Sequence, residues 1–150
     1  KSNKIKGCIV RFHNIYGPRM GDKHVIPEFI DRARKANKVF KIYGGKQTRA
    51  FCYIDDAIKF LYSLGRKKKI SYNLYHIGNP KEEIKISFLA KKIINLNSKK
   101  LKIIECGEPA ASVDRRCPDI KKVMKETGYK IQFNLESGLN KTFNWYLKNQ

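Results

Sequence analysis

The fold class is decided by the stretch Ala50-Phe-Cys-Tyr-Ile-Asp-Asp-Ala-Ile-Lys-Phe-Leu-Tyr-Ser-Leu-Gly65. Its first part, 50–54, is a short apolar run that predicts a strand. Asp55 or Asp56 then predicts a helix N-cap, and Gly65 ends the helix. The helix carries one apolar stripe, made of Ala57, Ile58, Phe60, Leu61 and Leu64. A strand that leads directly into an amphipathic helix is the repeating unit of α/β folds.

Strand and helix patterns alternate on both sides of this stretch. Apolar or alternating runs predict four more strands, at residues 6–11, 38–43, 72–77 and 101–106. Helical spacing of apolar residues predicts four more helices, at 27–36, 87–94, 119–127 and 135–147, with Ser87 and Asp119 as N-caps. The run at 6–11 predicts a buried strand that leads into a loop through 16–22. The chain is therefore predicted to be an α/β protein without internal repeats.

Length and composition limit the class of protein further. The chain has 150 residues, the length of one domain, and 41% of them are hydrophobic, which excludes a mainly disordered state. Charges interrupt every apolar run long before the roughly 18 residues that a membrane span requires, so we expect no membrane partner. The first residues, Lys-Ser-Asn-Lys-Ile-Lys, contain neither an initiator Met nor a signal sequence, which predicts an interior start within a longer protein.

Four cysteines, at positions 8, 52, 106 and 117, match neither a zinc site nor a small disulfide framework in their spacing. We therefore predict free thiols, no metal site and a reducing, cytoplasmic location. Cys52 and Cys117 are interpreted as packed thiols rather than nucleophiles, because nothing nearby in the sequence predicts a lowered pKa.

The formal net charge is +20, from 33 Lys+Arg against 13 Asp+Glu. Such an excess suggests nucleic acid or another phosphate-bearing partner. The lysines are nevertheless spread along the whole chain, and the one dense run is Arg66-Lys-Lys-Lys69. This distribution favours solvated faces over a nucleic-acid stripe.

Three basic or polar clusters stand where predicted loops meet regular elements. They are Arg11-Phe-His-Asn14 with Tyr16-Gly17, Gln47-Thr-Arg49, and Arg115-Arg116. Guanidinium groups bind phosphate in a bidentate manner, and loops on a rigid sheet bring such groups together. The clusters predict an anionic ligand, and a diphosphate fits them best.

Seven motifs now stand in one order along the chain: Arg11-Phe-His-Asn-Ile-Tyr-Gly-Pro18, His24-Val-Ile-Pro27, Lys41-Ile-Tyr-Gly-Gly45, Gln47-Thr-Arg-Ala-Phe-Cys-Tyr-Ile-Asp-Asp56, Tyr75-His-Ile-Gly-Asn79, Arg115-Arg-Cys-Pro-Asp-Ile120, and Gly138-Leu139 to Trp145-Tyr146. This order resembles the C-terminal half of the extended short-chain dehydrogenases, the NAD-dependent epimerases and dehydratases that act on nucleotide sugars. The resemblance covers nearly the whole chain.

The resemblance implies roles for eight residues. Phe12 and His13 would end the strand beneath the nicotinamide of NAD. The other six would bind the nucleotide diphosphate sugar: Asn14 near the phosphates, His24 and Val25 at the base or ribose, Tyr43 stacked on the base, and Arg49 and Arg116 as a clamp on the diphosphate. It also implies a fold made of the last strands of a Rossmann-type parallel sheet plus a small mixed α/β substrate-binding subdomain, and a homodimer in the full-length form.

Two parts of the family pattern do not occur in this sequence. They are the Gly-rich turn that seats the NAD pyrophosphate and the Tyr-x-x-x-Lys pair that transfers protons. Residues 1–150 are therefore expected to be a C-terminal part that lacks the N-terminal cofactor-binding half. We assign it no catalytic residue, and we expect half of a substrate site that is inactive alone.

Several residues have a structural interpretation as well. Asp55 and Asp56 are interpreted as helix caps rather than acids, and His76 as a packed core residue. Arg49 could form a surface ion pair, but its motif favours phosphate binding. Only one of Arg115 and Arg116 can point inward from an extended segment, and alignment to Cys-Pro-Asp selects Arg116. The alternative function is a basic, non-catalytic module that binds nucleotides or RNA.

Overall fold

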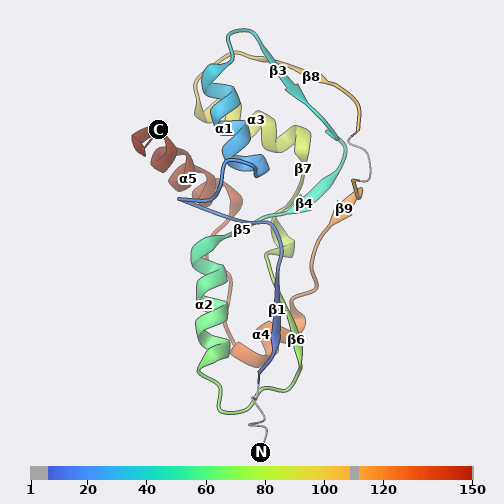
Figure 1. Cartoon of the computed structure of the whole chain (residues 1–150), viewed down its shortest axis with the longest axis vertical. Helices are drawn as coiled ribbons and strands as arrows, with labels where there is room; N and C mark the ends of the chain where they lie inside the picture. The colour runs from blue at the N-terminus through green and yellow to red at the C-terminus, as the bar shows by residue number, and fades with distance from the viewer. Residues whose placement is uncertain (1–6, 109–111, 150) are drawn as a thin grey trace, which may run out of the picture.

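The computed structural model describes residues 7–108 and 112–149 (Figure 1). The helices are α1 (Val25–Lys35), α2 (Ile54–Gly65), α3 (Ile86–Leu96), α4 (Lys121–Thr127) and α5 (Leu135–Asn149), with a 3₁₀ turn at Pro80–Glu82. The strands are β1 (Ile9–Phe12), β2 (Ile15–Tyr16), β3 (Val39–Ile42), β4 (Thr48–Ala50), β5 (Cys52–Tyr53), β6 (Leu74–Ile77), β7 (Glu83–Lys85), β8 (Lys102–Glu105) and β9 (Arg115–Arg116). The predicted alternation of strands and helices is confirmed.

The strands pair in four small sheets within the described residues. Three are parallel pairs, β1 with β6, β2 with β5, and β3 with β8. The fourth has the order β7-β4-β9, in which β4 runs antiparallel to β7 and parallel to β9. Parallel pairs joined through helices are the signature of an α/β fold, so the predicted fold class is confirmed.

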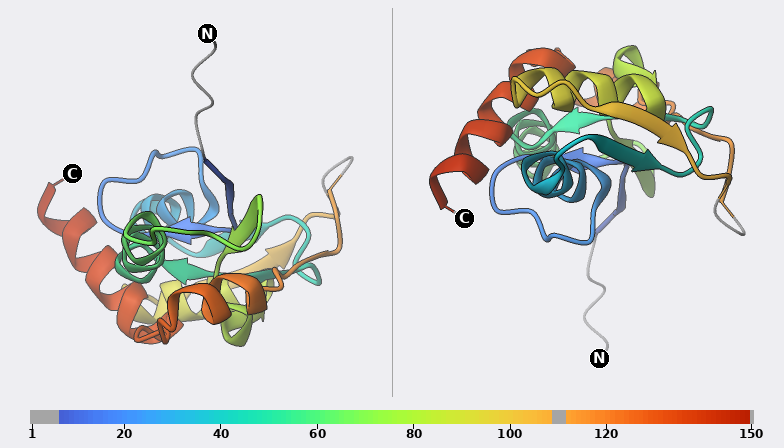
Figure 2. Two further views of the ribbon diagram at one scale, coloured as in Figure 1. Left: turned by 90° about the horizontal axis from the view of Figure 1, so that it is seen from below. Right: turned by 90° about the horizontal axis from the view of Figure 1, so that it is seen from above.

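Two hydrophobic cores divide the molecule into an upper and a lower part (Figure 1). Figure 2 looks along the long axis and shows α5 and β1 on opposite sides of the molecule. The upper part contains α1, α3 and α5, which contact one another and cover β3 and its neighbours. In the lower part, α2 and α4 pack on one face of the β1–β6 ladder through Phe60, Leu64 and Val123. The β2–β5 pair and β4 lie where the two parts meet (Figure 1).

The starts of two helices differ from the prediction. Helix α2 follows β5 directly, with extended Tyr53 as its N-cap, so that Asp55 and Asp56 lie inside its first turn. The Asp56 carboxylate is fully buried and accepts hydrogen bonds from the Tyr129 hydroxyl (2.6 Å) and from the backbone N–H groups of Gln132 (2.9 Å) and Phe133 (3.0 Å). It joins α2 to the segment before α5, a structural role in place of the predicted cap.

The other predicted caps have mixed outcomes. Helix α3 begins one residue before Ser87, after Lys85 as its N-cap, so Ser87 is not the cap. The N-cap of α4 is Ile120, one residue after the predicted Asp119, although the Asp119 carboxylate accepts the backbone N–H of Lys121 at 2.8 Å. Gly128, with a φ of 69°, ends α4 in the left-handed conformation as predicted.

The prediction that the first strand is buried is wrong for the described chain. Ile9 in β1 is 62% exposed, because it lies on the face of the β1–β6 ladder that carries no helices. Phe12, the last residue of the strand and on the other face, is 52% exposed. Two members of the predicted α2 stripe, Ile58 and Leu61, are exposed as well. Their inward-facing neighbours Ala57, Phe60 and Leu64 are buried as predicted.

Two simpler predictions concern membranes and thiols. None of the described helices has the length and apolar character to cross a membrane. The four cysteines all have free thiols, as predicted. Burial raises the pKa of the Cys52 thiol to about 12, which agrees with its interpretation as a packed side chain.

Candidate functional site: a paired-arginine cluster

Two arginines from distant stretches are neighbours on the central sheet. Strands β4 and β9 pair in parallel with Arg49 opposite Arg116 and Thr48 opposite Arg115. Register partners project to the same face of a sheet, so Arg49 and Arg116 share one face and Arg115 lies on the other. The sheet thus places Arg49 and Arg116, the two arginines selected from the sequence, side by side.

Arg49 is nearly buried, and the surrounding chain fixes its guanidinium group. Its Nη1 donates to the carbonyl oxygens of Thr48 (2.8 Å) and Asp114 (3.3 Å). Its Nη2 donates to Gln47 Oε1 (2.9 Å) and Ser112 Oγ (3.2 Å). These bonds tie β4 to the segment that leads into β9, and they hold the charge of Arg49 in one place.

The electrostatics of this pair favour an anion. Burial and then the nearby charge of Arg116 lower the pKa of Arg49. The Arg116 side chain is exposed, and its guanidinium group makes no hydrogen bond or ion pair with the described residues. An anion between the two guanidinium groups would offset their repulsion, and a phosphate group matches the fork of donors that arginine presents.

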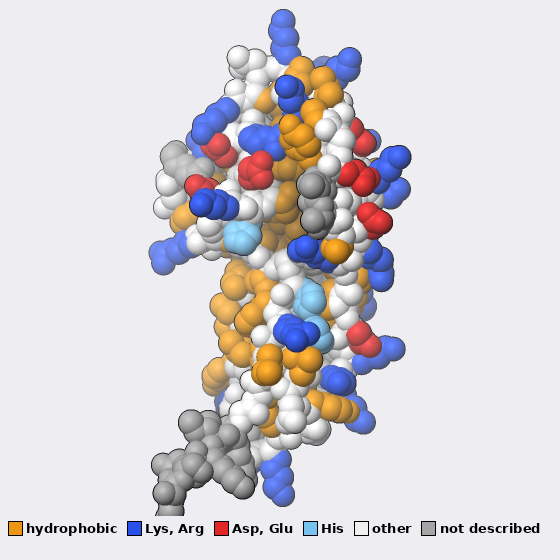
Figure 3. Space-filling view, turned by 45° about the vertical axis from the view of Figure 1, so that its right-hand side comes forward, with side chains coloured by type: hydrophobic (Ala, Val, Ile, Leu, Met, Phe, Trp, Pro, Cys, Tyr) orange, Lys and Arg blue, Asp and Glu red, His pale blue; other side chains and the backbone are white. Residues whose placement is uncertain are grey.

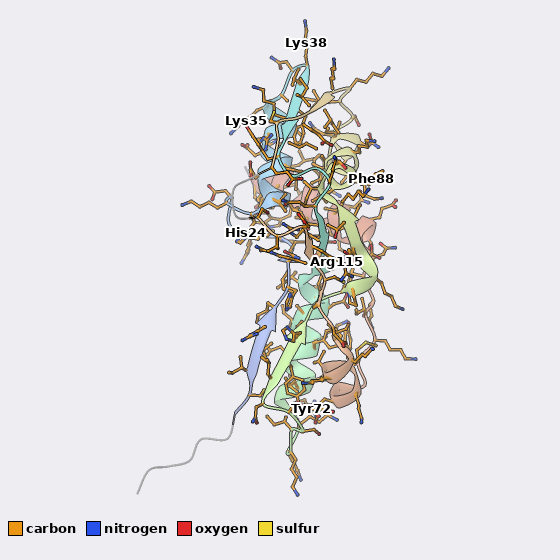
Figure 4. The ribbon with its side chains drawn as sticks, turned by 90° about the vertical axis from the view of Figure 1, so that its right-hand side faces the viewer. His24, Lys35, Lys38, Tyr72, Phe88 and Arg115 are labelled. Atoms are coloured by element: carbon orange, nitrogen blue, oxygen red, sulfur yellow. The ribbon has the colours of Figure 1, made fainter. Side chains whose placement is uncertain are left out.

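Arg115, the alternative to Arg116, is engaged elsewhere. Its Nε and Nη2 donate to the two carboxylate oxygens of Glu83, both at 2.8 Å, and the Thr48 hydroxyl donates to the same carboxylate at 2.6 Å. Arg115 and then Thr48 lower the pKa of Glu83 to about 2. Figure 4 shows Arg115 at mid-height, where the upper and lower parts meet. Since Arg115 is bound to Glu83, Arg116 is the residue left for a ligand.

Asn14 lies beside the arginine pair. It follows β1 in a left-handed conformation, with a φ of 43°, and its amide Nδ2 donates to the carbonyl oxygen of Ala50 at 3.0 Å. Because Ala50 is the residue after Arg49 in β4, this bond brings the end of the β1 loop next to the arginines. Three of the predicted substrate-binding residues therefore lie in one neighbourhood.

The carboxyl end of β1 carries the residues predicted to meet the cofactor. Phe12 is half exposed, and His13 Nε2 lies 2.6 Å from Nδ1 of His76. Burial, then His76, then Arg11 lower the pKa of His13. His76 is therefore half-buried and paired with His13, where the sequence predicted a packed core residue. Figure 3 shows histidine side chains on this face of the lower part.

The remaining predicted residues are exposed or half-buried around the upper part. His24 precedes α1 as its N-cap residue and makes no side-chain capping bond, and Val25 begins the helix. Tyr43 follows β3 and is 54% exposed. Within the part of the chain that the structure describes, no hydrogen bond links His24, Val25 or Tyr43 to the arginine pair. The structure therefore places them on accessible surface without assembling them into the same cluster.

Sequence reasoning missed the residues that organise the arginines. Gln47 is 5% exposed and its Oε1 accepts from Arg49 and from the Ser112 hydroxyl (2.8 Å). A Cβ at Gly44, whose φ is 62°, would lie 2.8 Å from the Gln47 Cδ, so this turn requires glycine. Gln47 stands in a quoted cluster and could have been found, whereas Glu83 and Ser112 are too distant in sequence to give a signal.

The next question is whether the described residues could form a metal centre. The described residues contain no group of three or more His, Cys, Asp or Glu side chains that could hold a metal ion. The cluster instead offers guanidinium and amide donors, which bind an anion and fix its orientation.

Comparison with known sequences gives one family for this chain. Residues 1–78 match the sequence profile described as "NAD dependent epimerase/dehydratase family". UDP-glucuronic acid decarboxylase 1 of Xenopus tropicalis is 32% identical over 150 residues, which cover 99% of this chain and 35% of the relative. UDP-N-acetyl-alpha-D-glucosaminuronate decarboxylase of Bacillus cytotoxicus is 30% identical over 147 residues, which cover 92% of this chain and 45% of the relative.

Comparison with solved structures gives the same fold. UDP-glucuronic acid 4-epimerase of Bacillus cereus, solved in complex with UDP-glucuronic acid and NAD, superposes with a TM-score of 0.84 at 24% identity. The match covers 95% of this chain and 46% of that one. The chain thus spans less than half the length of these relatives.

Proposed function

This chain belongs to the NAD-dependent epimerase/dehydratase family, and on that basis we propose that it forms the C-terminal, nucleotide-sugar-binding part of an enzyme of that family. The observation that carries the proposal is the arginine pair on β4 and β9, with Arg115 withdrawn by Glu83 and Asn14 close by. In this proposal the diphosphate of the sugar nucleotide lies between Arg49 and Arg116. The buried hydrogen bonds of Arg49 orient its charge before the ligand arrives.

The base and ribose would occupy the surface of the upper part. Tyr43 offers an exposed aromatic ring on which a nucleobase can stack, and His24 and Val25 offer an exposed helix start with backbone and side-chain contacts. A site for the diphosphate together with an exposed aromatic ring for the base is the composition that a nucleotide diphosphate sugar requires. The relatives named above for UDP sugars support this class of ligand.

The cofactor of the proposed enzyme is NAD. The half-exposed Phe12 ring and the His13 ring at the carboxyl end of β1 fit one face of a flat heteroaromatic group, since ligands of α/β sheets lie at the carboxyl ends of parallel strands. When bound, NAD would accept and return hydride. The residues of this chain would position the ring and limit its access to water.

The proposed reaction cycle oxidises the C4 hydroxyl of the sugar, rearranges the intermediate and returns the hydride. In that cycle the residues of this chain bind and orient the substrate, and the proton-transfer pair and Gly-rich turn belong to the remaining part of the enzyme. We accordingly expect the 150-residue chain to bind nucleotide without turnover. We also expect the complete enzyme to be a homodimer.

Nucleotide titration tests the proposal. The chain, joined to the remaining part of a relative, is titrated calorimetrically with UDP, UDP-glucuronic acid and uridine. Arg116→Ala should weaken UDP binding by about tenfold or more, since a charge-assisted contact is lost, and should leave uridine binding unchanged. Arg49→Ala should abolish UDP binding. Arg66→Ala, an exposed arginine at the end of α2, is the matched control and should bind as the parent does.

Two outcomes contradict the proposal. The first is that no nucleotide diphosphate sugar binds. The second is that binding survives Arg116→Ala and Arg49→Ala in variants that melt as the parent does. The alternative, an RNA-binding module, predicts instead a strongly salt-dependent affinity for single-stranded RNA that falls when Lys67, Lys68 and Lys69 are neutralised.

A further inference from the structure

A groove lies where the end of β6, helix α4 and the segment before α5 meet. It encloses about 590 Å³ and is lined by the 3₁₀ turn Pro80–Glu82, by Ile120 and Met124 at α4, and by residues 130–134. Figure 1 shows that last segment running from α4 in the lower part to α5 in the upper part. None of the residues placed in the candidate functional site lines this groove, here called the α4–α5 groove. Its volume is in the range of ligand sites.

Two buried side chains hold the walls of the groove in place. Asn79, 2% exposed, accepts a hydrogen bond from the backbone N–H of Lys81 (3.1 Å) and donates from Nδ2 to the carbonyl oxygen of Phe133 (3.3 Å). It therefore links the 3₁₀ turn on one wall to the segment 130–134 on the other. The Asp56 carboxylate holds the same segment from α2, through the N–H groups of Gln132 and Phe133. The groove is thus formed before a ligand arrives, which lowers the cost of binding.

The segment along one wall has the alternation of a strand but no strand partner among the described residues. Half-buried and exposed side chains alternate along it, the first being Tyr129, Ile131 and Phe133 and the second Lys130, Gln132 and Asn134. The backbone N–H and C=O groups of Lys130 and Ile131 make no hydrogen bond with the described residues. Free main-chain groups beside an apolar groove bind an extended peptide by strand addition, and alternate side chains of the peptide then enter the groove.

Lysines surround the groove. Lys81 and Lys130 are exposed on opposite walls, and neither forms an ion pair with the described residues. Lys141 of α5 places its Nζ 5.5 Å from the centre of the Phe133 ring, which lines the groove. On the lining itself, Glu82 is the acidic residue. Three cations against one carboxylate favour an acidic ligand.

The groove continues past Glu82 into a second hollow of about 300 Å³, lined in part by Lys92 of α3. The further acidic side chains there are paired, Glu83 with Arg115 (2.8 Å) and Glu136 with Lys92 (3.9 Å). They leave the positive character of the groove unchanged, and the added length suits a chain of several residues. A second copy of this protein is a poor occupant, because its 33 Lys+Arg against 13 Asp+Glu would bring mostly like charge.

We propose that the α4–α5 groove binds an acidic peptide segment of a partner protein in an extended conformation. The main chain of the peptide pairs with residues 130–131, and its alternate apolar side chains contact Met124 and Ile131. Carboxylates between them meet Lys81 and Lys130 at the rim. The groove lies apart from the arginine pair, so this docking site is independent of the proposed nucleotide site.

Peptide titration tests the proposal. A fluorescein-labelled peptide of alternating acidic and apolar residues, Glu-Leu-Asp-Ile-Glu-Leu-Asp, is titrated with the 150-residue chain and followed by fluorescence anisotropy. Two comparison peptides isolate its features. One has Ser in place of Leu and Ile, and the other carries N-methyl groups on alternate backbone nitrogens, so that it cannot donate to the free carbonyl groups of the chain.

Variants of the chain locate the site. Lys81→Glu with Lys130→Glu reverses the charge of the rim, and Lys68→Glu with Lys69→Glu, on the exposed loop after α2, is the matched control with the same change in net charge. All four side chains are exposed, so both variants should melt as the parent does.

A second pair of variants changes the apolar floor of the groove. Met124→Gln replaces an apolar side chain that is 37% exposed with a polar one of similar size. Leu147→Gln, at a residue 46% exposed on α5 and outside the groove, is its matched control.

The expected result is selective loss of affinity. The lysine reversal in the groove should weaken binding of the alternating peptide by about tenfold or more, since two attractive contacts become repulsive. Met124→Gln should weaken it by about threefold to tenfold, because apolar contact is lost. Both controls should bind as the parent does. The serine peptide and the N-methylated peptide should each bind the parent about tenfold more weakly or worse.

Three outcomes overturn the proposal. The first is that the alternating peptide does not bind at millimolar concentration. The second is that Lys68→Glu with Lys69→Glu weakens binding as much as the reversal in the groove, because net charge alone would then explain the affinity. The third is that the N-methylated peptide binds as well as its parent and decanoate displaces both, because the occupant would then be a small amphipathic anion.

Discussion

The β4–β9 and β1–β6 ladders are both parallel, but they are stabilised in different ways. The β4–β9 ladder is two residues long, yet Glu83, Gln47 and Ser112 surround it with side-chain hydrogen bonds. The β1–β6 ladder has twice as many paired residues but exposes one face and one edge. A site for a charged ligand thus depends on polar contacts made within this chain, whereas the longer strand depends on whatever covers it.

The largest expected effect concerns the buried carboxylate that holds the lower part together. Asp56→Ala removes a fully buried carboxylate and leaves the Tyr129 hydroxyl and the N–H groups of Gln132 and Phe133 without their acceptor. We expect the free energy of unfolding to fall by about 3–5 kcal/mol, measured by urea titration. Asp55→Ala, in the same helical turn and not hydrogen-bonded to described side chains, should cost less than about 1 kcal/mol. Equal losses for the two variants would contradict this account.

The next effect tests how closely the end of the β1–β6 ladder packs against the loops beside it. A Cβ at Gly78, after β6, would lie 2.6 Å from Pro118 Cγ and 3.2 Å from His13 Cβ. Gly78→Ala should therefore lower stability by about 1–3 kcal/mol. Gly65→Ala is the control, since a Cβ there has no neighbour within 4 Å, and it should be neutral or slightly stabilising. Thermal melting of both variants decides the point, and an unchanged Gly78→Ala would show that the Pro118 loop can move away.

The stability that Glu83 contributes beside the β4–β9 ladder depends on pH. The pKa of Glu83 is about 2 in the folded chain and lies near 4.5 when the chain is unfolded, so the unfolded state takes up a proton first as the pH falls. The stabilisation from Glu83 is complete above about pH 4.5 and is lost between there and pH 2. Because Arg115 is 66% exposed, we expect about 1–2 kcal/mol, less than the full shift implies. Urea titrations at pH 6 and pH 3 should differ less for Glu83→Gln than for the parent, and an equal difference would remove Glu83 from the account.

The two ladders also show what the sequence could predict. The alternation of strands and helices follows from apolar spacing, and the Gly128 terminus from local chemistry, so both were predicted. The burial of Ile9, Ile58 and Leu61 was predicted wrongly, because an apolar pattern does not tell which of its residues the rest of the chain covers. The two-residue strands β2 and β9 are too short to give a periodic signal. The bond between Arg115 and Glu83 joins residues 32 positions apart, which no spacing rule reveals.

The same reasoning applies to the candidate site. Arg49, Arg116 and Asn14 were selected from motifs. The sheet register pairs Arg49 with Arg116, and a hydrogen bond holds Asn14 to Ala50, the next residue of β4. Their roles, and those of Phe12, His13, His24, Val25 and Tyr43, stay predictions until a ligand is titrated. Gln47 was not selected, although its place beside Arg49 in a quoted cluster is a signal that could have found it.

The smallest expected effect comes from the contact between His13 and His76 at the end of the β1–β6 ladder. His13 has a pKa below 6.5 in the folded chain, because burial and the His76 ring 2.6 Å away disfavour its charged form. The unfolded state therefore binds the proton more readily, and stability falls as the pH drops below about 6.5. His13→Gln should flatten this slope between pH 7 and pH 5.5, with a change below about 1 kcal/mol, and His24→Gln is the matched control at an exposed histidine. A slope in His13→Gln that equals the slope of the parent would show that the histidine pair does not govern the pH response of the lower part.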